Sequence, residues 1–519
     1  MSVLVVLPVV MSLAGAAGVL LLGHWAVAQR ALSIVVHVVV LGCAVALLVV
    51  VDTVGPQVVP LGGWAPPVGI ALVADRLAAL LLVVSMTVLL AVLLYAIAQS
   101  RTDLEGGFPA SVFHPAYLVL TAGVCLAFLS GDLFTLFVGF EMVLTASYVL
   151  VTIGGTPERL RAGTTYVVVS LTGSILFLTT VALIYAATGT VNLADLAMRL
   201  GELEPGLRIT FALLLLVVFA IKAAVVPLHA WLPDSYPAAP SPITAVFAGL
   251  LTKIGVYAMI RTQTLLFPDG AAAGVLLVLA AATMLIGLLG AIAQSDLNRM
   301  LSFVLVGHIG YMLFGLGVFT VAGVAGAIFY TVHHIVATTA LFLASGLVER
   351  RTGTVDIERL GGLVKAIPLV GLLFAIPAAS LSGLPPLPGF LAKLALLQAA
   401  VSEGGAVTLT VAAITLLASV LTLVAMAKVW TTAFWGRPVS AQPDRDPHAA
   451  APRDADPQDA VLVGTKQRAP RSMTAPAGAL VAVGLGIVVL AGPLQAMTER
   501  AATDLLQPES YVQVVLDAR

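Results

Sequence analysis

Apolar stretches long enough to cross a bilayer alternate with short polar loops along almost the whole chain. A helix needs about 20 apolar residues to span the hydrocarbon core. Fourteen segments meet this length, at residues 2–23, 31–51, 74–98, 112–130, 132–153, 164–188, 208–228, 242–262, 271–293, 300–319, 323–348, 366–400, 407–435 and 475–496. The pattern predicts an all-α polytopic membrane protein with about 14 transmembrane helices.

Prolines interrupt two of these segments. Pro227 closes the apolar run of the seventh within PLHAWLP, and SGLPPLPG places Pro385 and Pro386 in the middle of the twelfth. A proline inside a helix removes a backbone donor and clashes with the preceding turn. We therefore predict that helices 7 and 12 are broken at these prolines.

The two broken helices occupy equivalent places in two blocks of five. Helices 4–8 (residues 112–262) and 9–13 (residues 271–435) each have the break in their fourth helix, and each break is close to a lysine. Because five is odd, successive blocks start on opposite sides of the membrane, so we predict two inverted repeats. Residues 1–111 hold helices 1–3. Residues 436–474, rich in Pro, Asp and Arg, are predicted to be a disordered cytoplasmic loop, and residues 475–519 the last helix and C-terminal tail.

Basic residues outside the helices concentrate in the odd-numbered loops, counted by the helix that they follow. Those loops hold Arg30, Arg101, Arg159, Arg161, Arg299, Arg350, Arg351, Arg359, Lys365, Arg437, Arg445, Arg453, Lys466, Arg468 and Arg471. The even-numbered loops and their edges hold Arg76, Arg199, Arg208 and Arg261. By the positive-inside rule the odd loops are cytoplasmic, which predicts both termini outside in a bacterial inner (plasma) membrane. The N-terminus lacks a basic region and a cleavage site, so we expect a first spanning helix and not a signal peptide.

Composition excludes several function classes. The chain is 60% hydrophobic and 10% charged, against about 25% charged residues in a soluble domain. A net charge of -1 argues against nucleic-acid binding. Cys43 and Cys125 lie in apolar runs without metal-ligand spacing, so no metal site and no cofactor are expected. The sequence has neither a phosphate-binding GxxxxGK[ST] motif nor CxxCH, so an ion gradient or a partner must drive any activity.

Ionisable residues inside spanning helices are few. Each costs roughly 2.5–3.5 kcal/mol at a helix centre, so each is a functional candidate. The candidates for proton transfer are Glu141, Lys222, Lys253, His308, His333, His334 and Lys393. Asp132, Asp234, Asp296 and Arg299 lie at helix ends, where we expect them to cap or anchor helices.

Glu141 and Lys222 are the strongest pair of candidates. Glu141 is the one acidic residue well inside an apolar segment, and Lys222 lies just before the first break. Burial destabilises a charged lysine whereas a nearby carboxylate stabilises it, so a lysine between the two can load and release a proton. The alternatives are a structural ion pair and a lysine that snorkels to the interface.

The histidines are candidates for the middle of a proton path. Tyr330, His334 and Thr338 share one helix face by their spacing. Histidine exchanges protons near neutral pH, although a hydrogen-bonded helix contact explains a single buried histidine equally well. His229, in the interrupted segment after helix 7, is an accessory candidate.

Four stretches resemble the antiporter-like subunits of proton-pumping NADH:quinone oxidoreductase and of Mrp cation/proton antiporters. They are GDLFTLFVGFEMVLTASYVL, IKAAVVPLHAWLPDSYPAAPSPITAVFAGLLTKIGVY, QSDLNRMLSFVLVGHIGYM and SGLPPLPGFLAKLALL, which together cover helices 5 to 12. Within this family the chain looks most like the D-type subunits of Mrp Na+/H+ antiporters. Lys393 argues against the M-type subunits of the oxidoreductase, where a glutamate is usual.

The resemblance implies a proton path near the membrane midplane, in a transporter subunit and not an enzyme. Glu141 matches the family's essential glutamate, Lys222 its broken-helix lysine, Lys253 its relay lysine and Lys393 its terminal lysine. The histidines match the family's relay less closely, because Ile335, Val336 and Ala337 stand where relatives often have a lysine. The expected partners are the other subunits of a hetero-oligomeric antiporter and the lipid bilayer, with protons and Na+ as the candidate ions.

Two other interpretations stay open at this point. A redox-driven respiratory or hydrogenase complex would use the same helices for proton pumping. A passive membrane scaffold would use the buried charges only to hold partners together. Whether the chain itself binds Na+ is also open, because a hard-cation site needs several oxygen ligands and the sequence alone assembles no such set.

Overall fold

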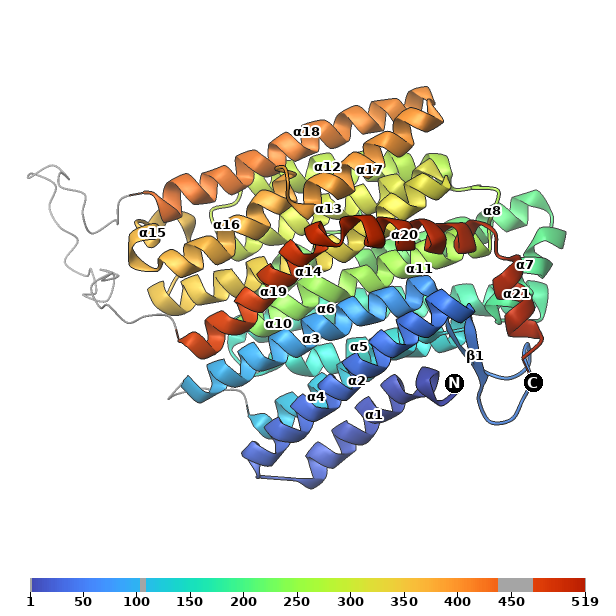
Figure 1. Cartoon of the computed structure of the whole chain (residues 1–519), viewed down its shortest axis with the longest axis horizontal. Helices are drawn as coiled ribbons and strands as arrows, with labels where there is room; N and C mark the ends of the chain where they lie inside the picture. Colours follow the sequence, from blue (N-terminus) through green and yellow to red (C-terminus); the bar gives the residue numbers. More distant parts are fainter. Residues whose placement is uncertain (1, 103–108, 437–469, 519) are drawn as a thin grey trace, which may run out of the picture.

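The computed structural model describes residues 2–102, 109–436 and 470–518, and within them the chain folds into a bundle of long, roughly parallel helices (Figure 1). Thirteen helices among the described residues are long and apolar enough to cross a membrane. Twelve of these spans are built on α1 (Ser2–Leu21), α2 (Ala26–Val54), α3 (Arg76–Thr102), α4 (Ala110–Leu129), α5 (Leu133–Thr152), α6 (Pro157–Thr188), α8 (Pro205–Ala223), α12 (Ala273–Ile292), α13 (Leu297–Val318), α14 (Val321–Thr352), α18 (Ala406–Val429) and α19 (Arg471–Val489). The other joins α10 (Ser241–Val246), the π-helical segment η3 (Phe247–Leu251) and α11 (Thr252–Leu265).

The predicted break in helix 12 is confirmed, and the two pieces complete a fourteenth crossing. They are α16 (Pro368–Ser382) and α17 (Pro388–Glu403). Gly383 ends α16 in the left-handed conformation with φ 85°, which glycine adopts without steric cost. Helix 7 breaks similarly, because α8 ends at Ala224 with φ 57° and the short helix α9 (Trp231–Ser235) follows.

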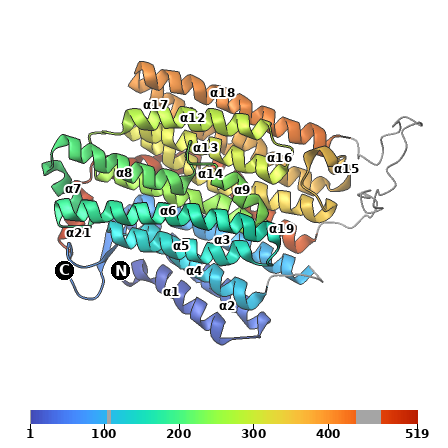
Figure 2. The ribbon, with the colours of Figure 1, turned by 180° about the vertical axis from the view of Figure 1, so that it is seen from behind.

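Short elements lie at the two ends of the bundle. Both termini lie at one end, together with α7 (Leu193–Arg199), α21 (Glu509–Leu516) and the hairpin of β1 (Gln57–Pro60) and β2 (Ala71–Ala74), while α15 (Leu363–Ala366) lies at the other (Figures 1 and 2). The remaining elements are α20 (Ala491–Leu506) and the 3₁₀ turns η1 (Leu200–Glu202), η2 (Tyr236–Ala238) and η4 (Ile357–Arg359), with a π segment η5 (Trp430–Phe434).

Three details differ from the predicted elements. The hairpin β1–β2 has no counterpart among the predicted helices, because both strands are only four residues long. Helix α19 begins at Arg471, inside the segment predicted to be a loop, and α20 extends the last helix beyond the apolar run. Residues 437–469 of that predicted loop lie outside the described residues.

The centre of the bundle is formed by three spans that neighbouring helices surround. The span Ser241–Leu265 and helix α14 are fully buried over their apolar windows, and α13 is nearly so. Close packing brings α12 and α13 together, since a Cβ added at Gly287 would lie 2.4 Å from the backbone nitrogen of Gly307. Small residues of this kind allow helix backbones to approach in membranes. These central spans carry Lys253 and all three candidate histidines.

The same turn follows α6 and α14, at opposite ends of the bundle. Each helix runs into a TGTV sequence, at residues 188–191 and 352–355. In both turns a valine carbonyl accepts a hydrogen bond from the first residue of the preceding long helix, at 3.0 Å for Val191 and Leu133 and 2.9 Å for Val355 and Leu297. The same backbone hydrogen bond thus connects the start of α5 to the turn after α6 and the start of α13 to the turn after α14.

Candidate proton-transfer site

Glu141 lies in the middle of α5, on the face that packs against α6. Asp132 starts the helix, because its carboxylate accepts hydrogen bonds from the backbone and hydroxyl of Thr135, each at 2.6 Å. The hydroxyl of Ser174, on α6, donates a hydrogen bond to Oε1 of Glu141. The Glu141 side chain is 29% exposed in the isolated chain. A carboxylate at this depth therefore reaches the flank of the bundle between α5 and α6.

Lys222 lies in the last turn of α8, where the helix breaks. Its Nζ donates to Ser174 Oγ at 2.8 Å and to the Ser170 carbonyl at 3.2 Å, and lies 4.0 Å from Glu141 Oε1. The side chain is 4% exposed. Carbonyl groups at a helix C-terminus favour a cation. Ser174 therefore bridges the acid and the base, and the two side chains meet through its hydroxyl.

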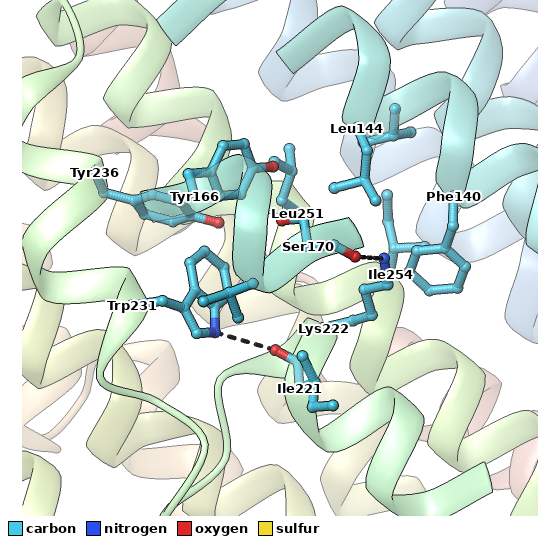
Figure 3. A pocket seen from close by; sticks show the side chains of 12 residues that line it. Phe140, Leu144, Tyr166, Ser170, Ile221, Lys222, Trp231, Tyr236, Leu251 and Ile254 are labelled. Carbon is cyan, nitrogen blue, oxygen red and sulfur yellow. Dashed lines mark hydrogen bonds between the residues drawn. The ribbon is translucent and has the colours of Figure 1, made fainter. Parts of the chain in front are cut away.

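A small cavity with room for about one water molecule adjoins Lys222 (Figure 3). Residues from α5, α6, α9 and α11 line it, and Figure 3 shows Tyr166, Trp231 and Tyr236 on the side away from Phe140. The Trp231 indole donates to the Ile221 carbonyl at 3.2 Å, which holds α9 against the end of α8. The lysine stem thus has space for about one water molecule beside it.

Lys253 lies at the start of α11, directly after the π-helical segment η3. Its Nζ donates to the Ala248 carbonyl at 2.6 Å, and the residue is fully buried. Segments of π-helix inside an α-helix occur frequently at functional sites. Among the described residues no hydrogen bond joins Lys253 to Lys222, but Gly255 packs against Ala223 at the end of α8. The two lysines therefore belong to helices in direct contact.

Four aromatic or imidazole rings form a central cluster between Lys253 and Lys393, which we define as His334, His308, Tyr330 and Tyr311. The rings of His334 and His308 have centroids 5.3 Å apart. Nδ1 of His308 and the Tyr330 hydroxyl share a hydrogen bond of 2.8 Å, and Tyr330 stacks on Tyr311 at 4.9 Å. Helix α14, which carries His334, packs against the π segment just before Lys253, since a Cβ added at Gly249 would meet Thr339. The predicted face of Tyr330, His334 and Thr338 is confirmed, since Thr338 Oγ1 lies 3.2 Å from the His334 ring nitrogens.

Lys393 ends this series on α17. Its Nζ donates to the Leu381 carbonyl at 2.7 Å and lies 4.7 Å from the centroid of the Tyr311 ring. The contact with Tyr311 is a cation–π interaction. The lysine thus reaches back across the break to the C-terminal end of α16, a partner that spacing along the chain did not indicate.

Other candidates lie further from the cluster. His333 meets the Tyr330 ring edge-on at 6.0 Å, and it lines a separate small cavity beside α19 with room for about one water molecule. His229 is half-buried with its ring 6.3 Å from that of Phe303. Pro227 follows the end of α8, and Pro385 and Pro386 connect α16 to α17. The structure thus joins Glu141 to Lys222 through Ser174, and His308 and His334 belong to the cluster that Lys393 meets. Lys253 lies on a helix in contact with α8, while His333 lies at the edge of the cluster and His229 lies apart.

The charged residues that we expected at helix ends cap helices or form ion pairs there. Asp296 starts α13 by accepting from the Arg299 backbone at 2.7 Å, and the Arg299 side chain pairs with Asp234 at 2.8 Å. Burial raises the pKa of both Asp132 and Asp296, against hydrogen bonds that act in the opposite direction. These carboxyls therefore serve the fold at the ends of the helices.

Sequence reasoning missed Ser170 and Ser174, which contact Lys222, and Thr422, whose hydroxyl lies 3.1 Å from His308 Nε2. The i,i+4 spacing of the two serines on one face of α6 is a signal that could have identified them. Among the described residues no group of three or more His, Cys, Asp or Glu side chains could hold a metal ion.

Comparisons with known proteins agree with this arrangement. The family model described as NADH:quinone oxidoreductase/Mrp antiporter, TM, matches residues 130–422. The chain is 43% identical over 439 residues to the D-type Na+/H+ antiporter subunit of Alkalihalophilus pseudofirmus, covering 84% of this chain and 88% of that protein. It is 36% identical to the protein of the same name from Bacillus subtilis, covering 91% and 90%.

A solved structure is similar over the whole chain. A chain in the structure of the Mrp complex from Dietzia sp. DQ12-45-1b superposes with a TM-score of 0.89 at 34% identity, over 99% of this chain and 100% of that one. Family model, relatives and structure all agree with the resemblance drawn from the four motifs. The chain therefore belongs to the NADH:quinone oxidoreductase/Mrp antiporter family and, within it, to the D-type subunits of Na+/H+ antiporters.

Proposed function

We propose that this chain is the proton-translocating subunit of a multisubunit Na+/H+ antiporter. The observation that carries the proposal is the hydrogen-bonded series Glu141, Ser174 and Lys222, which joins the membrane-spanning helices α5, α6 and α8. An intramembrane acid and base joined through one hydroxyl can pass a proton between them, whereas ion pairs with only a structural role need no such bridge. Charged groups at this depth are costly and are retained where they serve transport.

The first step loads Lys222. When Glu141 is ionised, it stabilises the ammonium form of the lysine through Ser174. Movement of the carboxylate away from Ser174 removes that stabilisation, and the buried ammonium then releases its proton. Making and breaking this contact therefore gates the passage of a proton into the bundle. Moving one charge against 100 mV costs about 2.3 kcal/mol, so loss of one charged contact is sufficient to drive the step.

The second step carries the proton across the central spans. Lys253 receives it, and the central cluster leads from His334, on the helix that packs against the segment just before Lys253, to Lys393. His308 is bonded on both ring nitrogens, to Tyr330 and Thr422, so it can accept a proton on one side and give one up on the other. Lys393 then releases the proton at the second break.

Partner subunits have a defined place in this scheme. Glu141 and the exposed Thr145 one turn later lie on the flank of α5. A carboxylate facing acyl chains is strongly unfavourable. We therefore infer that another protein of the antiporter complex covers this flank and closes the site from lipid.

The orientation follows from charge and from the shared position of the termini. Both termini lie at one end of the bundle (Figure 1), and the basic odd-numbered loops follow helices that end at the other. We place the odd-numbered loops in the cytoplasm of a bacterial cell and the termini outside. The two TGTV turns at opposite ends support two inverted units, residues 112–262 and 271–435.

The test is antiport in everted vesicles that contain the complete complex. Glu141→Ala and Lys222→Ala are each expected to abolish Na+-dependent proton movement, because each removes one end of the bridge. Blue-native gels on the same vesicles separate transport from assembly. Full antiport in both variants would end the proposal, and loss of assembly together with antiport would indicate a scaffold.

A further inference from the structure

We propose that the buried ion pair of Arg261 and Asp75 is a barrier that closes the outer end of the bundle to protons from Lys253. The pair joins α11 to the residue just before α3. This inference rests on the proposed function and on the orientation given with it. It adds the residues that prevent a proton in the central spans from leaking outward.

One face of α11 leads from Lys253 to the pair. Lys253, Tyr257 and Arg261 follow one another at i,i+4 spacing, so they share a side of this fully buried helix. At 1.5 Å per residue, Arg261 lies about 12 Å along the axis from Lys253. Its Nε donates to the Tyr257 hydroxyl at 3.4 Å, and that hydroxyl donates to the Phe128 carbonyl at 2.8 Å. A proton that left Lys253 along this face would therefore meet Arg261 after Tyr257.

The guanidinium of Arg261 is held by a carboxylate and two aromatic rings. Nη2 donates to Asp75 Oδ1 at 2.7 Å and Nη1 lies 2.5 Å from Oδ2, which makes the contact bidentate. The ring centroids of Tyr257 and Tyr511 each lie 5.4 Å from Cζ. Asp75 is fixed in turn, because Oδ1 also accepts from the Ala78 backbone at 2.9 Å. The two charged side chains are 4% and 5% exposed, so the pair is buried and fixed in position.

A guanidinium in this position stops a relay instead of continuing it. Arginine does not give up its proton in proteins, whereas lysine and histidine do. Its permanent charge repels an approaching proton, and an arginine excludes protons from some membrane pores in this way. The bidentate contact also occupies both oxygens of Asp75, the carboxylate that would otherwise receive a proton from this face.

The C-terminal helices cover the pair on its outer side. Tyr511, on α21, lies against the guanidinium of Arg261. Asp504, on α20, pairs at 2.6 Å with Arg76, the residue next to Asp75. Figure 1 shows α21 at the end of the bundle where both termini lie. The outer end of this face is therefore closed both by a fixed charge and by the chain's own C-terminal segment.

The same pair also anchors α3 to α11. An anchor depends equally on both partners, because loss of either one leaves the other buried without a counter-ion. A barrier depends on the positive charge, which only the arginine supplies. Substituting each partner in turn therefore separates the two roles.

The experiment measures passive proton flow through the intact antiporter complex in liposomes without Na+. A potassium gradient with valinomycin sets a negative potential inside, choline replaces Na+, and an internal pH dye records proton entry. Arg261→Gln removes the barrier charge and frees the Asp75 carboxylate, so proton entry should rise at least about tenfold above wild type. Asp75→Asn breaks the same pair, but it keeps the arginine charge and a side chain that caps α3, so its proton entry should stay at the wild-type rate.

Two further variants make the comparison specific. Arg208→Gln breaks an ion pair with Asp269 of 3.0 Å, near the start of α8, and should leave proton entry unchanged. If Arg261→Gln assembles poorly, the double variant Arg261→Gln/Asp75→Asn replaces it, since a neutral pair leaves no lone buried charge. The double variant should admit protons faster than Asp75→Asn alone, because it lacks the barrier charge.

The outcomes separate the barrier from an anchor and from the proposed function. A wild-type rate in Arg261→Gln, or an equal rise in Arg261→Gln and Asp75→Asn, would overturn the barrier. Lys253→Met added to Arg261→Gln should stop the leak, and a leak that persisted would show that it does not pass Lys253 and would overturn the barrier as well. Each of these failures leaves the proposed function standing, because antiport in Glu141→Ala and Lys222→Ala decides that separately.

Discussion

The two broken helices hold their lysines in different ways. Lys222 meets a hydroxyl, a carbonyl and, through Ser174, a carboxylate. Lys393 meets one carbonyl and the face of Tyr311. Both ammonium groups lie at the C-terminal end of a half-helix, where the aligned carbonyls favour a positive charge. Only the first lysine has a counter-ion within reach among the residues that the structure describes.

This difference assigns different roles to the lysines at the two breaks. A lysine with an adjustable carboxylate can be switched, because its charged state gains or loses a partner as the carboxylate moves. A lysine that contacts only a carbonyl and an aromatic ring has no movable counter-ion. Its protonation therefore depends on the proton that arrives through the central cluster. We infer that the first break controls loading and that the second break releases what it receives.

Removal of each lysine gives the largest expected effects. Lys222→Met and Lys393→Met should both reduce antiport in everted vesicles to the level of vesicles without the complex. Their stabilities should differ, because Lys222→Met leaves Glu141 without its partner. Breaking a fully buried pair costs about 3–5 kcal/mol, and partial exposure of Glu141 reduces this to about 2–3 kcal/mol. Lys393→Met should cost below about 1 kcal/mol, since a methionine fills the same space without leaving an unpaired acid.

Thermal unfolding of the purified complex measures this contrast. Lys365→Met is the matched control, because Lys365 is exposed at the end of the bundle and should affect neither antiport nor stability. Equal loss of stability in Lys222→Met and Lys393→Met would mean that Glu141 contributes nothing to holding the first lysine.

Ser174→Ala tests the bridge and should give the next largest effect. A hydrogen bond to a charged group contributes about 1.5–3 kcal/mol, and every 1.4 kcal/mol is tenfold, so the initial antiport rate should fall roughly 10- to 100-fold. Thr172→Ala on the same helix is the control for loss of a hydroxyl. A rate within twofold of wild type in Ser174→Ala would show that Glu141 and Lys222 communicate without the serine.

Tyr330→Phe tests the link between the two breaks. The variant keeps the ring that stacks on Tyr311 but removes the hydroxyl bonded to Nδ1 of His308. A neutral hydrogen bond is worth about 0.5–1.5 kcal/mol, so the antiport rate should fall roughly 2- to 10-fold. Tyr117→Phe, which removes an equally buried hydroxyl from α4, is expected to leave the rate unchanged. The same slowing in both variants would point to a general loss of packing instead of a broken relay.

Sequence patterns predicted the membrane-spanning helices because a helix in lipid must be long enough and apolar enough to cross the bilayer. Length and hydropathy were sufficient for the helices, and the prolines at 227, 385 and 386 were sufficient for both breaks. The hairpin β1–β2 and helices α7 and α21 lie outside the apolar windows, where no comparable constraint acts. Their positions depend on tertiary contacts that hydropathy does not encode.

The site was only partly predictable for a similar reason. Ionisable residues in apolar segments are recognisable by their cost, so Glu141, Lys222 and Lys393 could be named from sequence. A serine in a membrane helix costs little and satisfies itself on its own backbone, so Ser174 gives a weak signal. The contact of Lys393 with Leu381 depends on how the chain turns at the break, which spacing alone does not fix.

The helix caps give the smallest expected effect and allow the starts of α5 and α13 to be compared. Asp132 and Asp296 each start a helix whose first residue is bonded to a TGTV turn. Loss of such a cap costs about 1 kcal/mol, so Asp132→Ala and Asp296→Ala should each lower the unfolding temperature by about 1 °C with antiport unchanged. Asn caps helices as well as Asp does, and burial raises the pKa of both carboxyls. The neutral side chain of Asp132→Asn and Asp296→Asn should therefore preserve stability. Slower antiport in Asp132→Ala alone would contradict this expectation. It would mean that the start of α5 positions Glu141 for transport, whereas the start of α13 has no such effect on His308. The contrast between the two lysines would then extend to the helices that carry these two residues.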